Sequence, residues 1–218
     1  MTKKRISEAK TLEQYRVTLE NTASQPQIAT TMAEYGYGSA EMATGQALYD
    51  TTVQAFDSGT TETDEASAAF AVFDAKKNQL SDIYSAHRRK AKVVFQNDPV
   101  TAKKLEITGT VPAAYVNWLD TVSIFYTISI KEAEIQTKLG RLKITLDDLN
   151  AANALIPEVK ASRAAYLKEK GESEDSTSKK DSAFARLDDW MSEFYSVAKI
   201  AMEDNPQLLE ALGLTIKK

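Results

Sequence analysis

The chain has 218 residues, 43% of them hydrophobic and 27% charged, which is enough to bury a core as one domain or as two small ones. Its formal net charge of −4 provides no whole-molecule attraction for nucleic acid or anionic membranes. It contains no cysteine, which excludes disulfides, thiol catalysis and thiolate metal sites, and its 8 glycines and 5 prolines are few enough for long helices.

Proline and glycine divide the first part of the chain into helices. Thr11 is placed to cap a helix that Pro26 interrupts, and we expect a second helix to begin at Pro26. The glycines in 36–38 predict a turn, which is followed by a helix to about residue 56. The polar segment 57–67 then predicts an exposed loop.

A long helix from about residue 65 to residue 96 is predicted next. It ends at the sequence Asn-Asp-Pro over 97–99, because a residue before proline avoids the α region. Asp98 is therefore expected to cap a short helix that begins at Pro99 and runs to about residue 106.

The stretch 111–130 is the most apolar part of the chain, and Asp120 is its only charged residue. Apolar side chains spaced three and four residues apart share one helical face: Tyr115, Trp118, Leu119, Val122, Phe125 and Tyr126. We expect a buried helix here, with Thr110 as its cap and Pro112 at its first position, ending near Gly140.

Two alternatives exist for this stretch. Residues 121–130 alternate between apolar and polar positions and are rich in β-formers, which would also suit a strand. We prefer the helix because no other segment offers an obvious strand to pair with, and a single strand leaves its backbone polar groups unpaired. A transmembrane span is disfavoured by six Asn, Asp, Ser and Thr residues in 111–130 and by the lack of a flanking aromatic belt.

The second half of the chain repeats this order of elements. Thr145 and Asp148 resemble a capping pair that opens a helix, in which Pro157 predicts a kink or a break. The polar segment 171–181 predicts another exposed loop. A last long helix is expected over about 178–203, followed by a short helix after the proline of Asp-Asn-Pro.

A shift of 107 residues aligns 80–108 with 187–215 without a gap, and 8 of the 29 aligned pairs are identical. The identical pairs are Leu80/Leu187, Asp82/Asp189, Ser85/Ser192, Ala91/Ala198, Lys92/Lys199, Pro99/Pro206, Leu105/Leu212 and Thr108/Thr215. We therefore predict an all-α fold built by tandem duplication of a three- to four-helix up-down bundle unit, with repeat 1 at 1–109 and repeat 2 at 110–218. Packing of the two repeats as one elongated body is compatible with this prediction.

His87 is the only histidine, and it lies on the apolar face of its predicted helix. A core or boundary histidine is the favoured interpretation, and a pH-sensitive contact is the alternative. Zinc sites and Ser-His or Cys-His nucleophiles are excluded without a second histidine or any cysteine. The Glu-x-x-His pattern of di-iron bundles and a glycine-rich phosphate loop are also missing from the sequence. We predict no catalytic residue, no cofactor and no metal site.

The segment 87–92 contains the one basic cluster of the chain. Its candidate contacts to nucleic-acid phosphates are Arg88, Arg89, Lys90 and Lys92. The alternative is a solvated face with favourable charge near a helix C-terminus. At the positions shifted by 107 the sequence reads Phe-Tyr-Ser-Val over 194–197, so the cations are not part of a shared scaffold.

The last long helix carries more aromatic surface than one buried face requires. The residues concerned are Trp190, Met191, Phe194 and Tyr195. Core packing is the favoured interpretation of this group. An interface with a partner or with a second copy is the alternative, because Tyr, Trp and Met concentrate in interfaces.

Together these features predict a non-enzymatic helical-bundle protein with a structural, scaffolding or self-assembling role. Its expected partner is another protein or further copies of itself. The alternatives are a nucleic-acid-binding protein that uses 87–92 and a membrane-active protein that exposes the helix over 111–130. An enzyme built from carboxylates and lysines is a further option, since such sites assemble in space. The first ten residues lack the apolar run of a secretory signal, so a cytoplasmic location is the default expectation.

Overall fold

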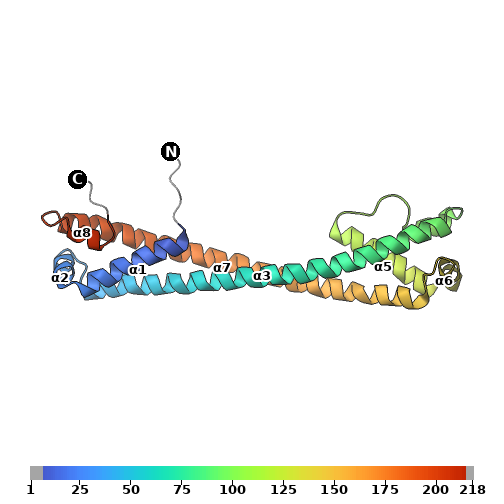
Figure 1. The fold of residues 1–218 in the computed structure, drawn as a ribbon, viewed down its shortest axis with the longest axis horizontal. Helices are drawn as coiled ribbons and strands as arrows, with labels where there is room; N and C mark the ends of the chain where they lie inside the picture. The colour runs from blue at the N-terminus through green and yellow to red at the C-terminus, as the bar shows by residue number, and fades with distance from the viewer. Residues whose placement is uncertain (1–6, 215–218) are drawn as a thin grey trace. The chain divides into compact units, whose positions relative to one another are not determined.

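The computed structural model describes residues 7–214, and every element of regular secondary structure in that range is an α-helix (Figure 1). In chain order these helices are α1 (Glu8–Ser24), α2 (Pro26–Glu34), α3 (Ser39–Val94), α4 (Pro99–Lys104), α5 (Tyr115–Lys131), α6 (Ala133–Gly140), α7 (Leu146–Ala201) and α8 (Leu208–Ala211). The all-α prediction is confirmed.

The helices belong to two compact units, and the two longest helices contribute to both. Unit 1 is the chain up to Thr63 and from Gly171 onward, with α1, α2, the first part of α3, the last part of α7, and α8. Unit 2 is Asp64–Lys170, with the rest of α3, α4, α5, α6 and the first part of α7. Each unit therefore joins helices from both halves of the sequence. The division at 1–109 and 110–218 concerns sequence repeats and stays a prediction.

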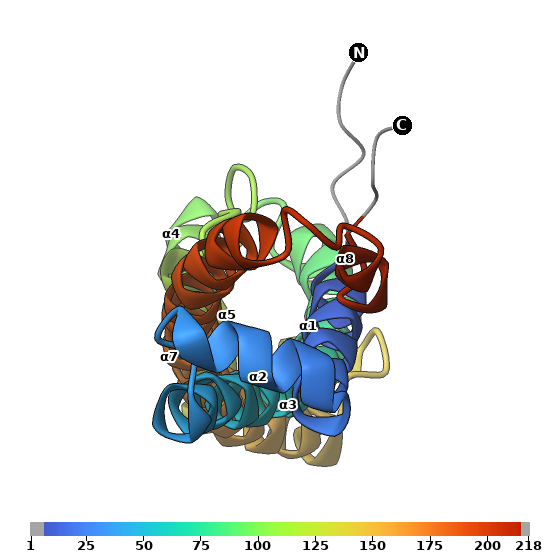
Figure 2. The same cartoon turned by 90° about the vertical axis from the view of Figure 1, so that its left-hand side faces the viewer.

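Unit 1 has its own hydrophobic core, and α2 lies crosswise to α1 and α3 at one end of it (Figures 1 and 2). The buried side chains of this core include Leu12, Leu19, Ile28, Met32, Tyr37, Leu187, Met191 and Phe194. The short segment around α8 contacts α1, where the Thr18 hydroxyl donates to the Leu212 carbonyl at 3.1 Å. This unit thus packs α7 and α8 from late in the chain against α1 from its beginning.

Unit 2 is organised around α5, the helix predicted from the apolar stretch. The buried side chains of α5 include Trp118, Leu119, Val122, Phe125 and Tyr126, and they belong to one core with residues of α3, α6 and α7. The predicted buried face is confirmed, and the strand alternative for 121–130 is wrong because the whole segment is helical. The helix begins at Tyr115 after an extended Ala114, so Thr110 and Pro112 lie ahead of it.

Three local sequence features predicted helix starts correctly. Pro26 occupies the first position of α2. Asp98 caps α4, because its carboxylate accepts from the Thr101 N–H at 3.0 Å and from the Thr101 hydroxyl at 2.8 Å. Thr145 and Asp148 form a reciprocal capping box at the start of α7, with N–H to side-chain distances of 2.9 and 3.1 Å.

The two predicted polar loops are helical, which is the largest difference from the sequence-based expectation. Segment 57–67 lies inside α3, and segment 171–181 lies inside α7. In the first of these segments, the hydroxyls of Thr60, Thr61 and Thr63 donate to the carbonyls four residues earlier, at 2.7–3.2 Å. The packed face of these segments consists of small and polar residues, such as Gly59 against Ser176 and Lys180, so composition alone did not separate them from loops.

Pro157 and Gly140 also behave differently from their predictions. Pro157 lies inside α7, which continues through it without a break. The buried neighbours Ile156 and Val159 keep this part of α7 in the core of unit 2. Gly140 is the last residue of α6, whereas the left-handed conformation that closes the helix is adopted by Lys143 (φ 57°).

The helix starts recur at one fixed interval. The starts of α5, α6 and α7 each follow those of α1, α2 and α3 by 107 residues, and α5 and α7 also end 107 residues after α1 and α3. The region aligned from sequence agrees with this interval, except that Thr215 lies outside the described residues. The interval therefore applies well beyond the segment with recognisable sequence identity.

Left-handed residues recur at the same interval. Gly36 (φ 94°) is matched by Lys143 (φ 57°), and Glu106 (φ 52°) is matched by Gly213 (φ 74°). The helix-closing hydrogen bonds follow the same pattern: the N–H of residue 37 donates to the Met32 carbonyl at 2.9 Å, and that of residue 144 donates to the Leu139 carbonyl at 3.3 Å. Equivalent backbone turns thus close α2 and α6.

Burial recurs at this interval as well. The pairs in which both residues are buried include Leu12/Leu119, Leu19/Tyr126, Ile28/Ile135, Met32/Leu139, Tyr37/Ile144, Leu80/Leu187, Tyr84/Met191, Ala91/Ala198, Phe95/Met202 and Leu105/Leu212. In every pair one residue lies in the core of unit 1 and the other in the core of unit 2. The two cores are built at corresponding positions of the chain.

Candidate interaction surfaces

The predicted nucleic-acid contacts lie near the C-terminal end of α3, in unit 2. Arg88 donates to the carbonyls of Thr108 and Gly109 at 3.3 and 2.8 Å, and Lys92 donates to the Gly109 carbonyl at 3.3 Å. These two cations hold the connection between α4 and α5. Arg89 and Lys90 are rotated away from Arg88 by successive steps of about 100° around the helix. The structure therefore brings two of the four cations together, on backbone carbonyls, and nucleic-acid binding stays a prediction.

His87 is half-buried against α5. Its Nδ1 atom lies 3.2 Å from the Tyr126 hydroxyl, and the two rings meet edge to face. Burial lowers the pKa of His87 below its usual value, and the charge of Lys90 acts in the same direction, while Asp148 opposes them. This geometry favours a neutral boundary histidine that bonds to a tyrosine.

The aromatic group of the last long helix lies in the core of unit 1. Met191 and Phe194 are fully buried, so only Trp190 and Tyr195 retain accessible surface. The Trp190 indole N–H donates to Glu41 at 2.6 Å, and the Tyr195 hydroxyl lies 2.7 Å from that of Thr18. These contacts join α7 to α3 and α1 within the unit. Participation of the group in an interface stays a prediction.

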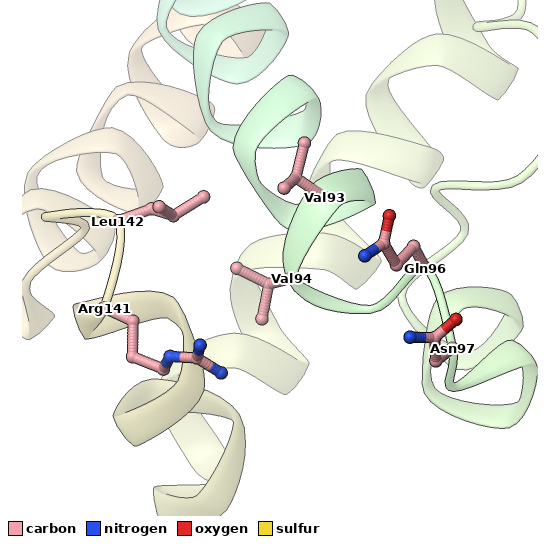
Figure 3. A pocket seen from close by; sticks show the side chains of 6 residues that line it. All are labelled: Val93, Val94, Gln96, Asn97, Arg141 and Leu142. Atoms are coloured by element: carbon pink, nitrogen blue, oxygen red, sulfur yellow. The ribbon is translucent and has the colours of Figure 1, made fainter.

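A groove of about 360 Å³ opens where the end of α3 meets the turn after α6 (Figure 3). We call its lining residues the unit 2 corner: Val93, Val94, Gln96, Asn97, Arg141 and Leu142. In Figure 3 the Leu142 side chain extends toward α3, and Val94 lies between Arg141 and Gln96. Val93 is 57% exposed and Leu142 is 36% exposed. The corner therefore combines two accessible apolar side chains with a mostly polar groove surface and one guanidinium.

The corresponding positions of unit 1, 107 residues away in the sequence, lie at the end of α2 and at and just after the end of α7. We call them the unit 1 corner: Glu34, Tyr35, Ile200, Ala201, Glu203 and Asp204. Tyr35 is 48% exposed and Ile200 is 62% exposed, so this corner also presents large apolar side chains. Its charges are opposite to those of unit 2, because Glu34 occupies the position of Arg141. The two corners thus share their apolar character and differ in charge.

The charge difference extends to the whole of each unit. Unit 2 contains 16 Lys and Arg residues and 13 Asp and Glu residues, a net charge of +3. The remaining 11 basic and 18 acidic residues give unit 1 a net charge of −7. The modest total of −4 therefore conceals an acidic unit and a basic unit. Potentials of opposite sign on two surfaces favour their association in a defined orientation.

Sequence reasoning missed the corner residues. Val93 and Leu142 are 49 positions apart and stand in unremarkable helix-end sequences, so no spacing links them. A signal was nevertheless present: the 107-residue shift places Glu34 opposite Arg141, and a comparison of charge between aligned positions finds this reversal. The whole-chain net charge conceals it because the acidic and basic residues offset one another.

None of the helices in residues 7–214 combines the length and apolarity needed to cross a membrane. Comparison of the chain with protein-family models, with curated proteins and with solved structures finds no match in any of the three.

Proposed function

We propose that this protein is a non-enzymatic structural protein that assembles through contacts between copies of itself. One observation carries the proposal: corresponding corners of the two units both expose large apolar side chains, while the units carry net charges of −7 and +3. Exposed apolar surface supplies the driving force for association, and opposite charges select which surfaces meet. A role as a scaffold for a different protein follows the same logic and is the nearest variant.

We further propose that the chain arose by tandem duplication of a unit of about 107 residues, and that the repeats exchange their helices. The common interval of the helix starts, of the left-handed residues and of the buried pairs supports the duplication. The exchange is supported by equivalent contacts. Gln14 lies beside Gly213 in unit 1, and at the shifted positions Thr121 donates to the Glu106 carboxylate at 3.3 Å in unit 2.

Sedimentation velocity over a dilution series tests the assembly function. We expect the average mass to rise with concentration above the 24.1 kDa of one chain, and to rise less at high salt, because exposed opposite charges are screened. A mass of one chain at every concentration and salt condition would contradict self-assembly.

The nucleic-acid alternative has one feature in its favour, the net positive charge of unit 2. Binding of labelled single- and double-stranded DNA and RNA at two salt concentrations checks it, since phosphate contacts lose affinity steeply with salt. Substitution of Arg89 and Lys90 by glutamine leaves the loop contacts of Arg88 and Lys92 in place, so it isolates the other two cations of the cluster.

A further inference from the structure

We infer that the unit 2 corner of one copy binds the unit 1 corner of a second copy. This inference depends on the proposed self-assembly and names the surfaces that carry it. The partner is a second copy because the chain itself supplies both a basic corner and an acidic one. Contacts between two corners of the same kind would instead place like charges together, which costs free energy.

The unit 2 side of this contact is a shallow groove with an accessible cation. Val93 and Leu142 provide its apolar walls, and the exposed Arg141 guanidinium offers donors in a planar fork. Such a fork suits a carboxylate that accepts two parallel hydrogen bonds. Most of the groove surface is polar, because Gln96, Asn97 and Arg141 also line it, so the groove suits an amphipathic side chain that lies next to an acidic residue.

The unit 1 corner presents that combination in adjacent residues. Glu34 and Tyr35 follow one another at the end of α2, both side chains are exposed, and Tyr35 offers an aromatic ring with a polar tip. Ile200 adds apolar area from the end of α7. Tyrosine is among the residues that most often dominate the energy of an interface. We assign Tyr35 to the groove and Glu34 to Arg141.

The proposed contact joins two different surfaces, so it does not close on itself after one step. Head-to-tail contacts of this kind produce either rings or open chains of copies. Each corner comprises six residues, against about 20–30 a side in a stable interface, and small interfaces are typical of weak, reversible association. We therefore expect assembly that depends on concentration and weakens with salt.

Charge reversal in the full-length chain tests the contact. R141E places a carboxylate opposite Glu34, and E34R places a guanidinium opposite Arg141. Each variant alone is expected to weaken self-association about tenfold or more, measured as the dissociation constant by sedimentation velocity at low salt. An equimolar mixture of the two variants is expected to associate again, because the carboxylate introduced by R141E in one copy then meets the guanidinium introduced by E34R in the other.

Matched controls separate this contact from the general effect of charge. K160E and D57R make the same changes in net charge at exposed positions of α7 and α3 that lie outside both corners. They are expected to leave the dissociation constant within about twofold of the parent value, as distant surface charges are screened. Circular dichroism confirms that each variant remains helical.

Three outcomes distinguish the hypotheses. Weakening by both reversals, with recovery in the mixture, supports the assigned contact. Self-association that is equal in the reversals and in the controls overturns this contact and leaves the proposed assembly function standing. If the parent protein itself stays monomeric at every concentration, the assembly function is overturned together with the contact.

Discussion

Units 1 and 2 bury corresponding positions but fill them with side chains of different size. In unit 1 the Trp190 ring packs directly on Gly45, so closely that a Cβ atom at residue 45 would lie well inside van der Waals contact of the ring. At the shifted positions unit 2 has Ile83 and Ala152. Tryptophan and glycine at this pair of positions thus correspond to isoleucine and alanine in unit 2. A larger residue at one position goes with a smaller residue at the other, so corresponding positions divide the buried volume differently.

The two units also differ in polarity at one position, which is half-buried in unit 2 and fully buried in unit 1. His87 of unit 2 corresponds to Phe194 of unit 1, which is fully buried and packs edge to face on Tyr37. Unit 2 thereby has a titratable imidazole that bonds to the Tyr126 hydroxyl, at a position where unit 1 has a ring-to-ring contact. Equivalent backbones therefore give the units different responses to pH, and the variants below exploit this difference.

The largest predicted effect concerns the core of unit 2. Trp118 is buried, whereas the corresponding residue of unit 1 is the smaller Thr11. We expect W118A to lower the free energy of unfolding by about 3–5 kcal/mol, measured by urea denaturation. V116A is the control, because Val116 is 69% exposed on the same helix and should change stability by less than about 0.5 kcal/mol. A loss for W118A no larger than that for V116A would contradict the burial of this ring.

The next effect tests the relationship in side-chain size between residues 45 and 190 of unit 1. G45A is expected to lower the free energy of unfolding by about 1–3 kcal/mol, because the added methyl group overpacks the contact with Trp190. In a W190I background, where G45A completes the isoleucine–alanine pair found in unit 2, the same change should become stabilising by up to about 1 kcal/mol through higher helix propensity. Urea denaturation of the four chains gives both values. An effect of G45A with the same sign and size in both backgrounds would refute the size relationship.

A smaller effect is expected at residues 36 and 143, which share a left-handed backbone conformation but differ in residue type. K143G should raise the free energy of unfolding by about 0.5–1 kcal/mol, because glycine adopts the left-handed conformation of residue 143 without the strain that a side chain imposes. The reverse change at the equivalent position, G36A, should be destabilising by about 1–2 kcal/mol. Thermal denaturation is sufficient to rank the variants. Stability changes of opposite sign for K143G and G36A are expected if the two turns are equivalent. Changes of the same sign would contradict that equivalence.

The smallest effect is a pH dependence confined to unit 2. Burial lowers the pKa of His87 in the folded chain, so the unfolded chain, whose histidine titrates near pH 6.5, binds the proton more tightly. The stabilisation is complete above about pH 6.5 and decreases as the pH falls below that value. H87F, which copies unit 1, should remove this component from the pH profile of urea denaturation, while Y126F should retain it. An unchanged profile for H87F would assign the pH dependence to other groups.

Local chemistry predicted much of the fold, and the limits of the prediction are visible at one pair of positions. Pro26 predicts the break between α1 and α2, because a residue before proline avoids the α region, and Gln25 is indeed extended. The corresponding break at Glu132 has no proline, and the predicted helix runs through it. Packing of the buried Ile135 and Leu139 holds α6 in its place. The break in the second half is therefore fixed by tertiary contacts that local signals do not contain.

The long polar segments of α3 and α7 show a second limit. Their sequences resemble loops because they offer few apolar residues, yet they are continuous helix. Apolar periodicity detects only a helix whose buried face is apolar, so it fails where the packed face consists of small and polar residues, such as Gly59 beside Ser176 and Lys180. The corner residues were not predicted from the sequence for a related reason. Their surface is formed by the end of α3 and the turn after α6, so it exists only in the folded unit.

The proposed exchange of helices between repeats is tested most directly by a circular permutant. A copy of residues 108–114 joins Leu214 to Glu8, and the chain is opened between residues 110 and 111, so that unit 1 gains the connection that unit 2 loses. We predict the same helical signal, one cooperative unfolding transition and a free energy of unfolding within about 2 kcal/mol of the parent chain, since only loop connectivity changes. A permutant opened inside α3, after Gly59, serves as the control and should be strongly destabilised. Equal failure of both permutants would contradict the equivalence of the two units.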